Sequence, residues 1–200
     1  MQKNEIEIFY PKSQTAWRKW LEKNHLSKQA VWLVFYNKKS EIKSITWSDA
    51  VDVALCFGWI DSKKIKIDEE TSHQFFSKRK PKSTWSKINK NKVDTLIEQG
   101  LMTKAGFTSI ETAKQNGSWT ILDEVEELII PLDLDRAFLD KPNAKDHFLS
   151  LSKSTRKLLL TQLLFVKTTQ TRQKRIAEII ERSEKIKAKT LVEKTHTSNS

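Results

Sequence analysis

The stretch at residues 46–80, TWSDAVDVALCFGWIDSKKIKIDEETSHQFFSKRK, decides the fold of the first half of the chain. Thr46 and Asp49 have the spacing of a capping box with Asp in the Glu position, which predicts that a helix begins here. The apolar stripe of this helix is formed by Val51, Ala54 and Leu55. Gly58 stands where a left-handed residue ends a helix, so we expect the helix to stop at this point.

Two strands are predicted directly after this helix. Apolar residues recur at the period of a strand over residues 59–67, and residues 73–80 form a second run rich in aromatic residues. Residues 68–72 between them are polar and read as a turn. The two runs should therefore pair as a hairpin.

The preceding segment adds two more strands and a helix. Residues 6–10 read as a short strand ended by Pro11, and residues 30–36 are a nearly continuous apolar run typical of a buried strand. Between them, Ser13 has the place of an N-cap. The inward face of the helix that it caps is predicted to carry Trp17, Trp20 and Leu21.

The chain beyond the hairpin is predicted to be helical. Ser83 or Ser86 caps a first helix that Gly100 ends, and Thr103 begins a second that Gly117 ends. The residues expected to point inward are Ile88, Val93, Leu96 and Ile97 in the first helix and Phe107, Ile110 and Ala113 in the second.

The C-terminal part should contain helices only. Residues 119–131 are acidic and read as a linker carrying a short element, and short helices are predicted at 132–139 and 144–149. Residues 154–167 are apolar almost all round, which predicts a buried helix. The last predicted helix, 172–186, is amphipathic. Its apolar face is formed by Ile176, Ile179, Ile180 and Ser183.

These elements predict an α+β protein. A small, mostly antiparallel sheet with packed helices is followed by a helical C-terminal subdomain. The expected domains are an α+β domain at 1–120 and a helical domain at 131–187. Residues 188–200 lack apolar periodicity and should form a disordered tail.

Composition argues against several classes of site. The 200 residues include one cysteine, Cys56, so neither an intramolecular disulfide nor a cysteine cluster for a metal is possible. The four glycines cannot build a phosphate-binding loop, and the four histidines lack metal-ligand spacing. We expect no metal and no cofactor. The N-terminus has no apolar core of a secretory signal, and the run at 158–166 is too short to span a bilayer, so a cytoplasmic protein is expected.

The net charge of +11 is unevenly placed along the chain. Residues 78–104 hold eight basic residues against two acidic, residues 105–149 hold four against nine, and residues 150–200 hold twelve against four. A basic chain favours nucleic acids or acidic partners. Pairing between the basic and acidic segments would absorb much of this charge, which weakens the case for nucleic acid and favours the interpretation that the lysines are merely solvated.

Several motifs resemble the bacteriocin-protection, YdeI/OmpD-associated family. In the C-terminal part, 131–187, the matching runs are Asp133-Leu-Asp-Arg-Ala-Phe138, Phe148 ahead of Ser150-Leu-Ser-Lys-Ser154, and Thr171-Arg-Gln-Lys-Arg-Ile176. The front half looks like that of longer members, through ALCFGWIDS at 54–62, RKPKSTWSKIN at 79–89 and LMTKAG at 101–106. The resemblance implies a bacterial stress or envelope-tolerance role, linked to bacteriocin protection and to an outer-membrane porin. It brings no catalytic residues.

One cluster combines positive charge, an aromatic ring and a helix start within eight residues. Arg79 and Lys80 precede Pro81, and the free amides of a following helix favour an anion. In this hypothesis Trp85 stacks on a planar ligand, while Asp61 lies beside Arg79 and orients its guanidinium. The complete candidate set is Trp59, Asp61, Arg79, Lys80, Ser83, Trp85, Ser86 and Asn89. The alternative is a plain N-capped helix with solvated lysines.

Two further candidates also have structural interpretations. Arg172 and Arg175 lie on neighbouring helix positions, either to contact a ligand or to pair with acids such as Asp133 and Asp135. Cys56 is placed near a helix C-terminus, where the dipole disfavours a thiolate, so it reads as a core residue rather than a nucleophile.

The sequence thus favours a non-enzymatic stress- or envelope-tolerance binding protein, whose partner is an unknown protein or an anionic ligand. The alternative is nucleic-acid binding through the basic surface at 79–92. A third hypothesis is an enzyme acting on an anionic small molecule with Asp61 as the base. Steep salt dependence of nucleic-acid binding would separate the alternative from the first hypothesis. The oligomeric state cannot be read from the residues.

Overall fold

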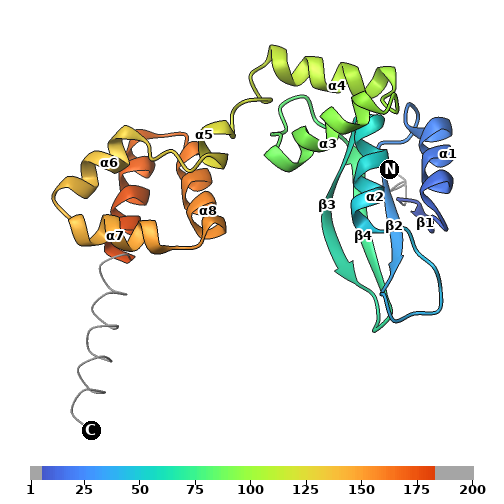
Figure 1. Cartoon of the computed structure of the whole chain (residues 1–200), viewed down its shortest axis with the longest axis horizontal. Coiled ribbons are helices and arrows are strands. Elements are labelled where there is room, and N and C mark those ends of the chain that lie inside the picture. Colours follow the sequence, from blue (N-terminus) through green and yellow to red (C-terminus); the bar gives the residue numbers. More distant parts are fainter. Residues whose placement is uncertain (1–5, 183–200) are drawn as a thin grey trace, which may run out of the picture. The chain divides into compact units, whose positions relative to one another are not determined.

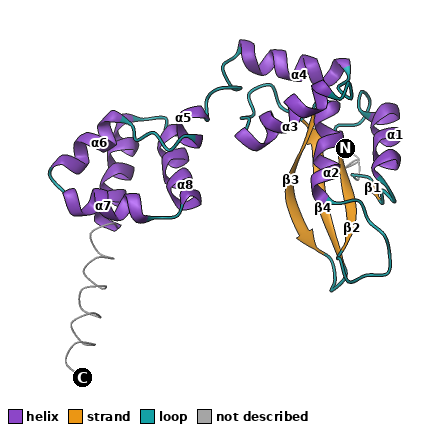
Figure 2. Cartoon of the chain, in the orientation of Figure 1, coloured by secondary structure: helices purple, strands orange, loops and turns teal. Residues whose placement is uncertain are grey.

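The computed structural model describes residues 6–182 and divides between Ile121 and Leu122 into two compact units. The first unit is α+β and the second is helical, as Figures 1 and 2 show. The predicted fold class is therefore confirmed. The predicted tail at 188–200 and the last residues of the predicted helix at 172–186 lie outside the described residues.

The N-terminal unit contains a four-stranded sheet with the order β1-β2-β4-β3. Its strands are β1 (Ile8–Phe9), β2 (Ala30–Tyr36), β3 (Trp59–Lys66) and β4 (Thr71–Lys78). β1 lies parallel to β2, whereas β2 and β3 both pair antiparallel with β4. The predicted hairpin is confirmed, but β4 begins and ends two residues earlier than predicted. Arg79 and Lys80 consequently follow the strand instead of belonging to it.

Four helices accompany this sheet: α1 (Gln14–Asn24), α2 (Trp47–Cys56), α3 (Lys87–Glu98) and α4 (Lys104–Gln115). The α1 residues Trp17 and Trp20 contact Phe76 of β4 and Trp59 of β3, with ring centroids 5.6 and 5.9 Å apart. Strand alternation puts Val31, Leu33 and Phe35 of β2 on the same buried side. The core of this unit therefore lies between one face of the sheet and the helices.

The predicted helix caps are largely confirmed. Thr46 caps α2 by accepting from the Asp49 N–H at 3.1 Å, and Ser86, not Ser83, caps α3. Gly58 adopts φ +70°, the left-handed conformation predicted for it. The predicted inward faces of α3 and α4 are only partly confirmed, because each helix buries a narrower stripe than its sequence pattern indicated. The predicted core residues that are exposed are Ile88 at 67%, Ile97 at 41% and Phe107 at 42%.

The C-terminal unit is built from α5 (Asp123–Glu126), α6 (Leu132–Leu139), α7 (Pro142–Ser150), α8 (Lys153–Leu164) and a last helix described at 169–182. Its core includes Leu134, Phe138, Phe148 and Leu160. The prediction that α8 is buried all round was wrong, because Leu158 is 58% exposed and the helix buries one face. Val125 of the predicted linker also packs into this core.

Candidate functional site

Arg79 is held between the sheet and α3 by three contacts. Its backbone N–H donates to the Gly58 carbonyl at 2.9 Å, and its Nη2 donates to the Thr84 carbonyl at 2.7 Å. The guanidinium lies over the Trp85 ring, 3.6 Å from the ring centroid. Burial lowers the pKa of Arg79 to about 10, opposed by attraction to Asp61. Arg79 therefore remains charged at neutral pH.

Trp85 cannot stack on a ligand in this arrangement. Its side chain is 1% exposed, and it contacts Arg79 and the ring of Trp119, whose centroid lies 4.9 Å away. The sequence pattern correctly placed a base and an indole together. The pattern did not reveal that the Arg79 guanidinium itself covers the Trp85 ring.

Asp61 is engaged by neutral donors and does not orient Arg79. One carboxylate oxygen accepts from Trp47 Nε1 at 2.9 Å and from Gln74 Nε2 at 3.0 Å. The predicted hydrogen-bonded pair with Arg79 is wrong in geometry, although the two charges attract at longer range. Two donors on one oxygen indicate a structural role for this carboxylate rather than that of a base.

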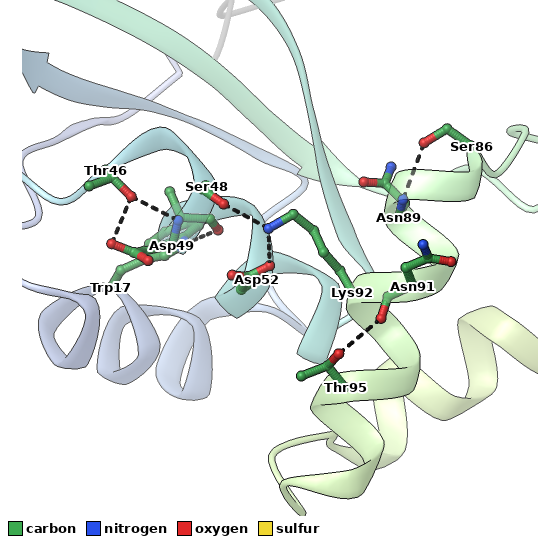
Figure 3. A network of polar contacts seen from close by, with 11 residues as sticks. Trp17, Thr46, Ser48, Asp49, Asp52, Ser86, Asn89, Asn91, Lys92 and Thr95 are labelled. Atoms are coloured by element: carbon green, nitrogen blue, oxygen red, sulfur yellow. Dashed lines mark hydrogen bonds and ion pairs between the residues drawn. The ribbon is translucent and has the colours of Figure 1, made fainter.

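Several other residues of the predicted surface at 79–92 make contacts within the protein (Figure 3). Ser86 Oγ accepts from the Asn89 N–H at 3.3 Å, while Lys92 Nζ donates to Ser48 Oγ at 2.8 Å and pairs with Asp52 at 2.5 Å. Ser83 donates to the Lys80 carbonyl at 2.7 Å. Ser83, Ser86 and Asn89 thus organise the chain, and Lys92 joins α3 to α2.

Arg79 also lines a groove of about 580 Å³, which brings three of the predicted residues together. Trp59, Arg79 and Lys80 line one part of it. The opposite wall is the first half of α4, which the sequence interpretation did not connect with the site. Gly58 allows α4 to lie close to the start of β3, since a Cβ on Gly58 would lie 3.0 Å from the Ala105 carbonyl oxygen.

The groove is basic. Its five basic lining residues are His25, Lys78, Arg79, Lys80 and Lys104, and none of the described lining residues is acidic. Lys78 is engaged, donating to the Leu26 carbonyl at 2.8 Å. Lys80 and Lys104 are exposed and form no ion pair with a described residue. Their two charges are therefore available to a ligand.

The interior of the groove is apolar and carries hydrogen-bonding groups at its edge. Leu26 is 77% exposed and supplies apolar surface, whereas the lining residues Phe57 and Trp59 are 4% and 0% exposed. The hydroxyls along α4 are those of Thr108, Ser109 and Thr112. Trp59 Nε1 and Arg79 Nε are buried N–H groups that have no acceptor among the described residues. Leaving a buried donor unpaired costs about 1–3 kcal/mol of folding free energy.

A sequence signal for the α4 wall does exist. Lys104, Thr108 and Thr112 recur every four residues and so share one helix face. Thr108 and Thr112 donate their hydroxyl protons to the backbone one turn earlier, at 2.9 and 2.8 Å. Their oxygens remain able to accept.

The second predicted set, Arg172 and Arg175, is paired within the C-terminal unit. Arg172 makes a two-pronged contact with Asp133 and donates to the Leu163 carbonyl at 2.8 Å. Arg175 pairs with Glu178 at 2.9 Å, and not with Asp133 or Asp135. The interpretation of these arginines as internal partners is confirmed for Arg172.

Comparison with known families gives two matches along the chain. Residues 9–109, half of the chain, match a domain of unknown function, DUF8412. The chain belongs to this family. Residues 127–185 match the family described as bacteriocin-protection, YdeI or OmpD-associated, which confirms the resemblance of the C-terminal part. The DUF8412 portion contains the sheet, Arg79 and the first residues of α4, and thus most of the groove. No curated protein and no solved structure was found to match the chain.

The described part of the chain offers neither a membrane-spanning helix nor a metal cluster. Within residues 6–182, every helix is too short or too polar to cross a membrane. The same residues contain no group of three or more His, Cys, Asp or Glu side chains placed to hold a metal ion.

Proposed function

We propose that this DUF8412 protein is a non-enzymatic binding protein with a role in stress or envelope tolerance of the bacteriocin-protection kind. Its N-terminal unit binds an organic anion in the groove between β4 and α4. The observation that carries the proposal is a groove with five basic lining residues, an apolar interior and no acidic residue among those described.

The ligand class follows from the arrangement of charge and apolar surface. Lys80 and Lys104 stand free at the groove and attract a carboxylate or phosphate. The exposed side chain of Leu26 favours an apolar body attached to that group. Neither a bare inorganic anion nor a neutral hydrocarbon satisfies both parts of the lining.

A binding role is also supported by the surroundings of the residues that a catalytic hypothesis would use. Cys56 is 1% exposed, and burial raises the pKa of its thiol, which disfavours a nucleophilic thiolate. Asp61, the base of the enzymatic hypothesis, is held by Trp47 and Gln74 and does not line the groove.

Calorimetric titration tests the proposal with four matched probes. Naphthoate and naphthyl phosphate carry both an apolar body and a charge, naphthalenemethanol carries the body alone, and inorganic phosphate carries the charge alone. We expect saturable binding of the first two and much weaker binding of the others. The double variant Lys80→Ala/Lys104→Ala should bind the anionic probes roughly tenfold or more weakly.

The matched control is Lys19→Ala/Lys23→Ala, which removes two exposed lysines of α1 that do not line the groove. It should bind as wild type does, because the net charge falls equally in both double variants. Equal losses in the two would show that only overall charge matters. Absence of binding by all four probes would also contradict the proposal.

The tolerance role is tested separately in cells. A bacterial strain lacking the protein should become more sensitive to a cationic antimicrobial peptide or bacteriocin, and the wild-type chain should restore tolerance. If the groove serves this role, Lys80→Ala/Lys104→Ala should fail to restore it while Lys19→Ala/Lys23→Ala succeeds. Unchanged sensitivity in the absence of the protein would refute the tolerance role without affecting the binding result.

A further inference from the structure

The outward face of the sheet carries a second aromatic cluster, separate from the groove. The register pairs Trp32 with Phe75 and Val34 with His73, so these residues point away from the face that packs on α1 and α2. Trp32 and Phe75 are partly exposed, and among the described residues neither belongs to a hydrophobic core cluster. None of the cluster residues lines the groove.

A lysine lies on these rings. Lys63 Nζ is 5.1 Å from the Trp32 ring centroid and 5.7 Å from that of Phe75. The Trp32 and Phe75 centroids are 4.9 Å apart, and the His73 ring lies 6.5 Å from Trp32. Three rings and one cation thus form a continuous patch across β2, β4 and β3.

The charges around the patch have one sign. The outward positions of the paired residues in β2, β3 and β4 include no acidic side chain among the described residues, as the sequence and register show. Lys64 follows Lys63 on the edge strand but pairs with the buried Gln74, so it belongs to the opposite face of the sheet. The acidic residues of this region, Asp68, Glu69 and Glu70, belong to the turn beyond β3.

The three rings and Lys63 favour a ligand that has planar groups and a negative charge. Bases stack on exposed aromatic rings of a sheet, while nearby cations meet the phosphates that link them. In a duplex the base faces are already stacked on each other and unable to stack on the protein. We propose that the outward face of the sheet binds single-stranded nucleic acid, with bases stacking on the exposed parts of Trp32 and Phe75 and a phosphate meeting Lys63.

The proposal differs from the nucleic-acid surface predicted at residues 79–92, where Trp85 is covered and Lys92 is paired. It is also independent of the groove. Either site can exist without the other, and their tests use different variants and different probes.

Fluorescence polarisation with labelled oligonucleotides of about ten nucleotides, within the site size of one such surface, tests the proposal on the full chain. Single-stranded oligothymidine should bind more tightly than a duplex of equal length. Trp32→Ala and Phe75→Ala should each weaken binding by roughly tenfold or more, whereas Trp32→Phe, which keeps a ring, should retain most of the affinity. Lys63→Ala should reduce the slope of log affinity against log salt by about 0.7 for each phosphate that the lysine neutralises.

The control is Phe107→Ala, because Phe107 is 42% exposed on α4 and lies outside both the patch and the groove lining. It should bind as wild type does, and circular dichroism should show that all variants remain folded. The proposal is overturned if no oligonucleotide binds, if the duplex binds equally well, or if the Trp32 and Phe75 variants match Phe107→Ala. It is also overturned if the wild-type chain forms dimers that Trp32→Ala abolishes, since the patch would then join two copies.

Discussion

Arg79 illustrates how one side chain can serve both the fold and the candidate site. Its guanidinium covers Trp85, its Nη2 satisfies the Thr84 carbonyl, and its backbone joins the start of β3 through Gly58. The same residue lines the groove. Replacing Arg79 would therefore disturb packing and charge together, so Lys80 and Lys104 are the better residues for testing ligand binding.

Cys56 provides a prediction about reactivity. The side chain is 1% exposed at the end of α2, and burial raises its thiol pKa. A thiol reagent should leave the native protein unlabelled and react once the protein is denatured. Cys56→Ala should lower the free energy of unfolding by about 1 kcal/mol. Rapid labelling of the native protein, followed by loss of anion binding, would contradict this interpretation.

The pair of Asp133 and Arg172 provides a prediction about pH. The hydrogen bond from Arg172 lowers the pKa of Asp133 below its ordinary value of 3.8. The pair therefore stabilises the folded state above about pH 4, and this contribution disappears as the pH falls through the lowered pKa. Because both side chains are partly exposed, the contribution at neutral pH should be about 1 kcal/mol or less.

Thermal unfolding between about pH 2 and pH 6 checks this behaviour. Asp133→Asn should be less stable than wild type at the upper end, and the two should converge at the lower end. Asp140→Asn is the control, since Asp140 is exposed and forms no ion pair with a described residue. A stability difference that stays constant through the acid range would show that Asp133 contributes through packing alone.

At the scale of elements, the junction of α2 with α4 positions one wall of the groove. Thr103 caps α4 and donates its hydroxyl to the Cys56 carbonyl at 2.7 Å, and its backbone N–H donates to the same oxygen at 3.1 Å. Gly106 allows this approach, because a Cβ at that position would lie 2.4 Å from the Cys56 oxygen. Helix α4 is thus fixed at its N-terminus beside the start of β3.

Gly106→Ala should separate these two helices. The backbone oxygen of Cys56 cannot yield without moving α2, so we expect the free energy of unfolding to fall by about 2 kcal/mol or more. Gly117→Ala is the matched control. It has φ +79° but open space around it, and should lose only about 1 kcal/mol through backbone strain. Chemical denaturation measures both. A Gly106→Ala protein as stable as wild type would contradict the packing described.

The elements that the sequence predicted well are those defined by local chemistry. Thr46, Gly58 and the alternating residues of the β3–β4 hairpin act within a few positions of each other, so their pattern is visible in the chain. The inward faces of α3 and α4 were less well predicted. Ile88 and Phe107 have the right spacing for a core, but which face is buried depends on distant partners such as α2.

The same limit applies to the site. Arg79 and Lys80, which are adjacent in sequence, line the same groove as Trp59, because the hairpin brings β3 and the end of β4 together. The α4 wall comes from a segment more than twenty positions later, and no local pattern connects Lys104 with Arg79. The contact of Arg79 with Trp85 could likewise not be predicted, since the spacing of residues along the chain does not show which group covers a ring.

At the scale of the whole molecule, ion pairs engage several of the basic side chains. In the C-terminal unit, Lys157 pairs with Glu126 and Lys145 with Asp135, in addition to the Arg172 pair. In the N-terminal unit Lys92 pairs with Asp52. The groove retains unpaired cations beside an apolar interior, which distinguishes it from a surface of merely solvated lysines.

Amide chemical-shift mapping on the full chain during titration with naphthoate tests the central claim, that this groove binds an organic anion, most directly. The account predicts saturable shifts confined to the groove, including Gly58, Lys80, Ala105 and Ser109, and no comparable shifts with naphthalenemethanol. Lys80→Ala/Lys104→Ala should weaken the response, while Lys19→Ala/Lys23→Ala should leave it unchanged. Shifts spread over α1 and the C-terminal unit, or none at any naphthoate concentration, would contradict it.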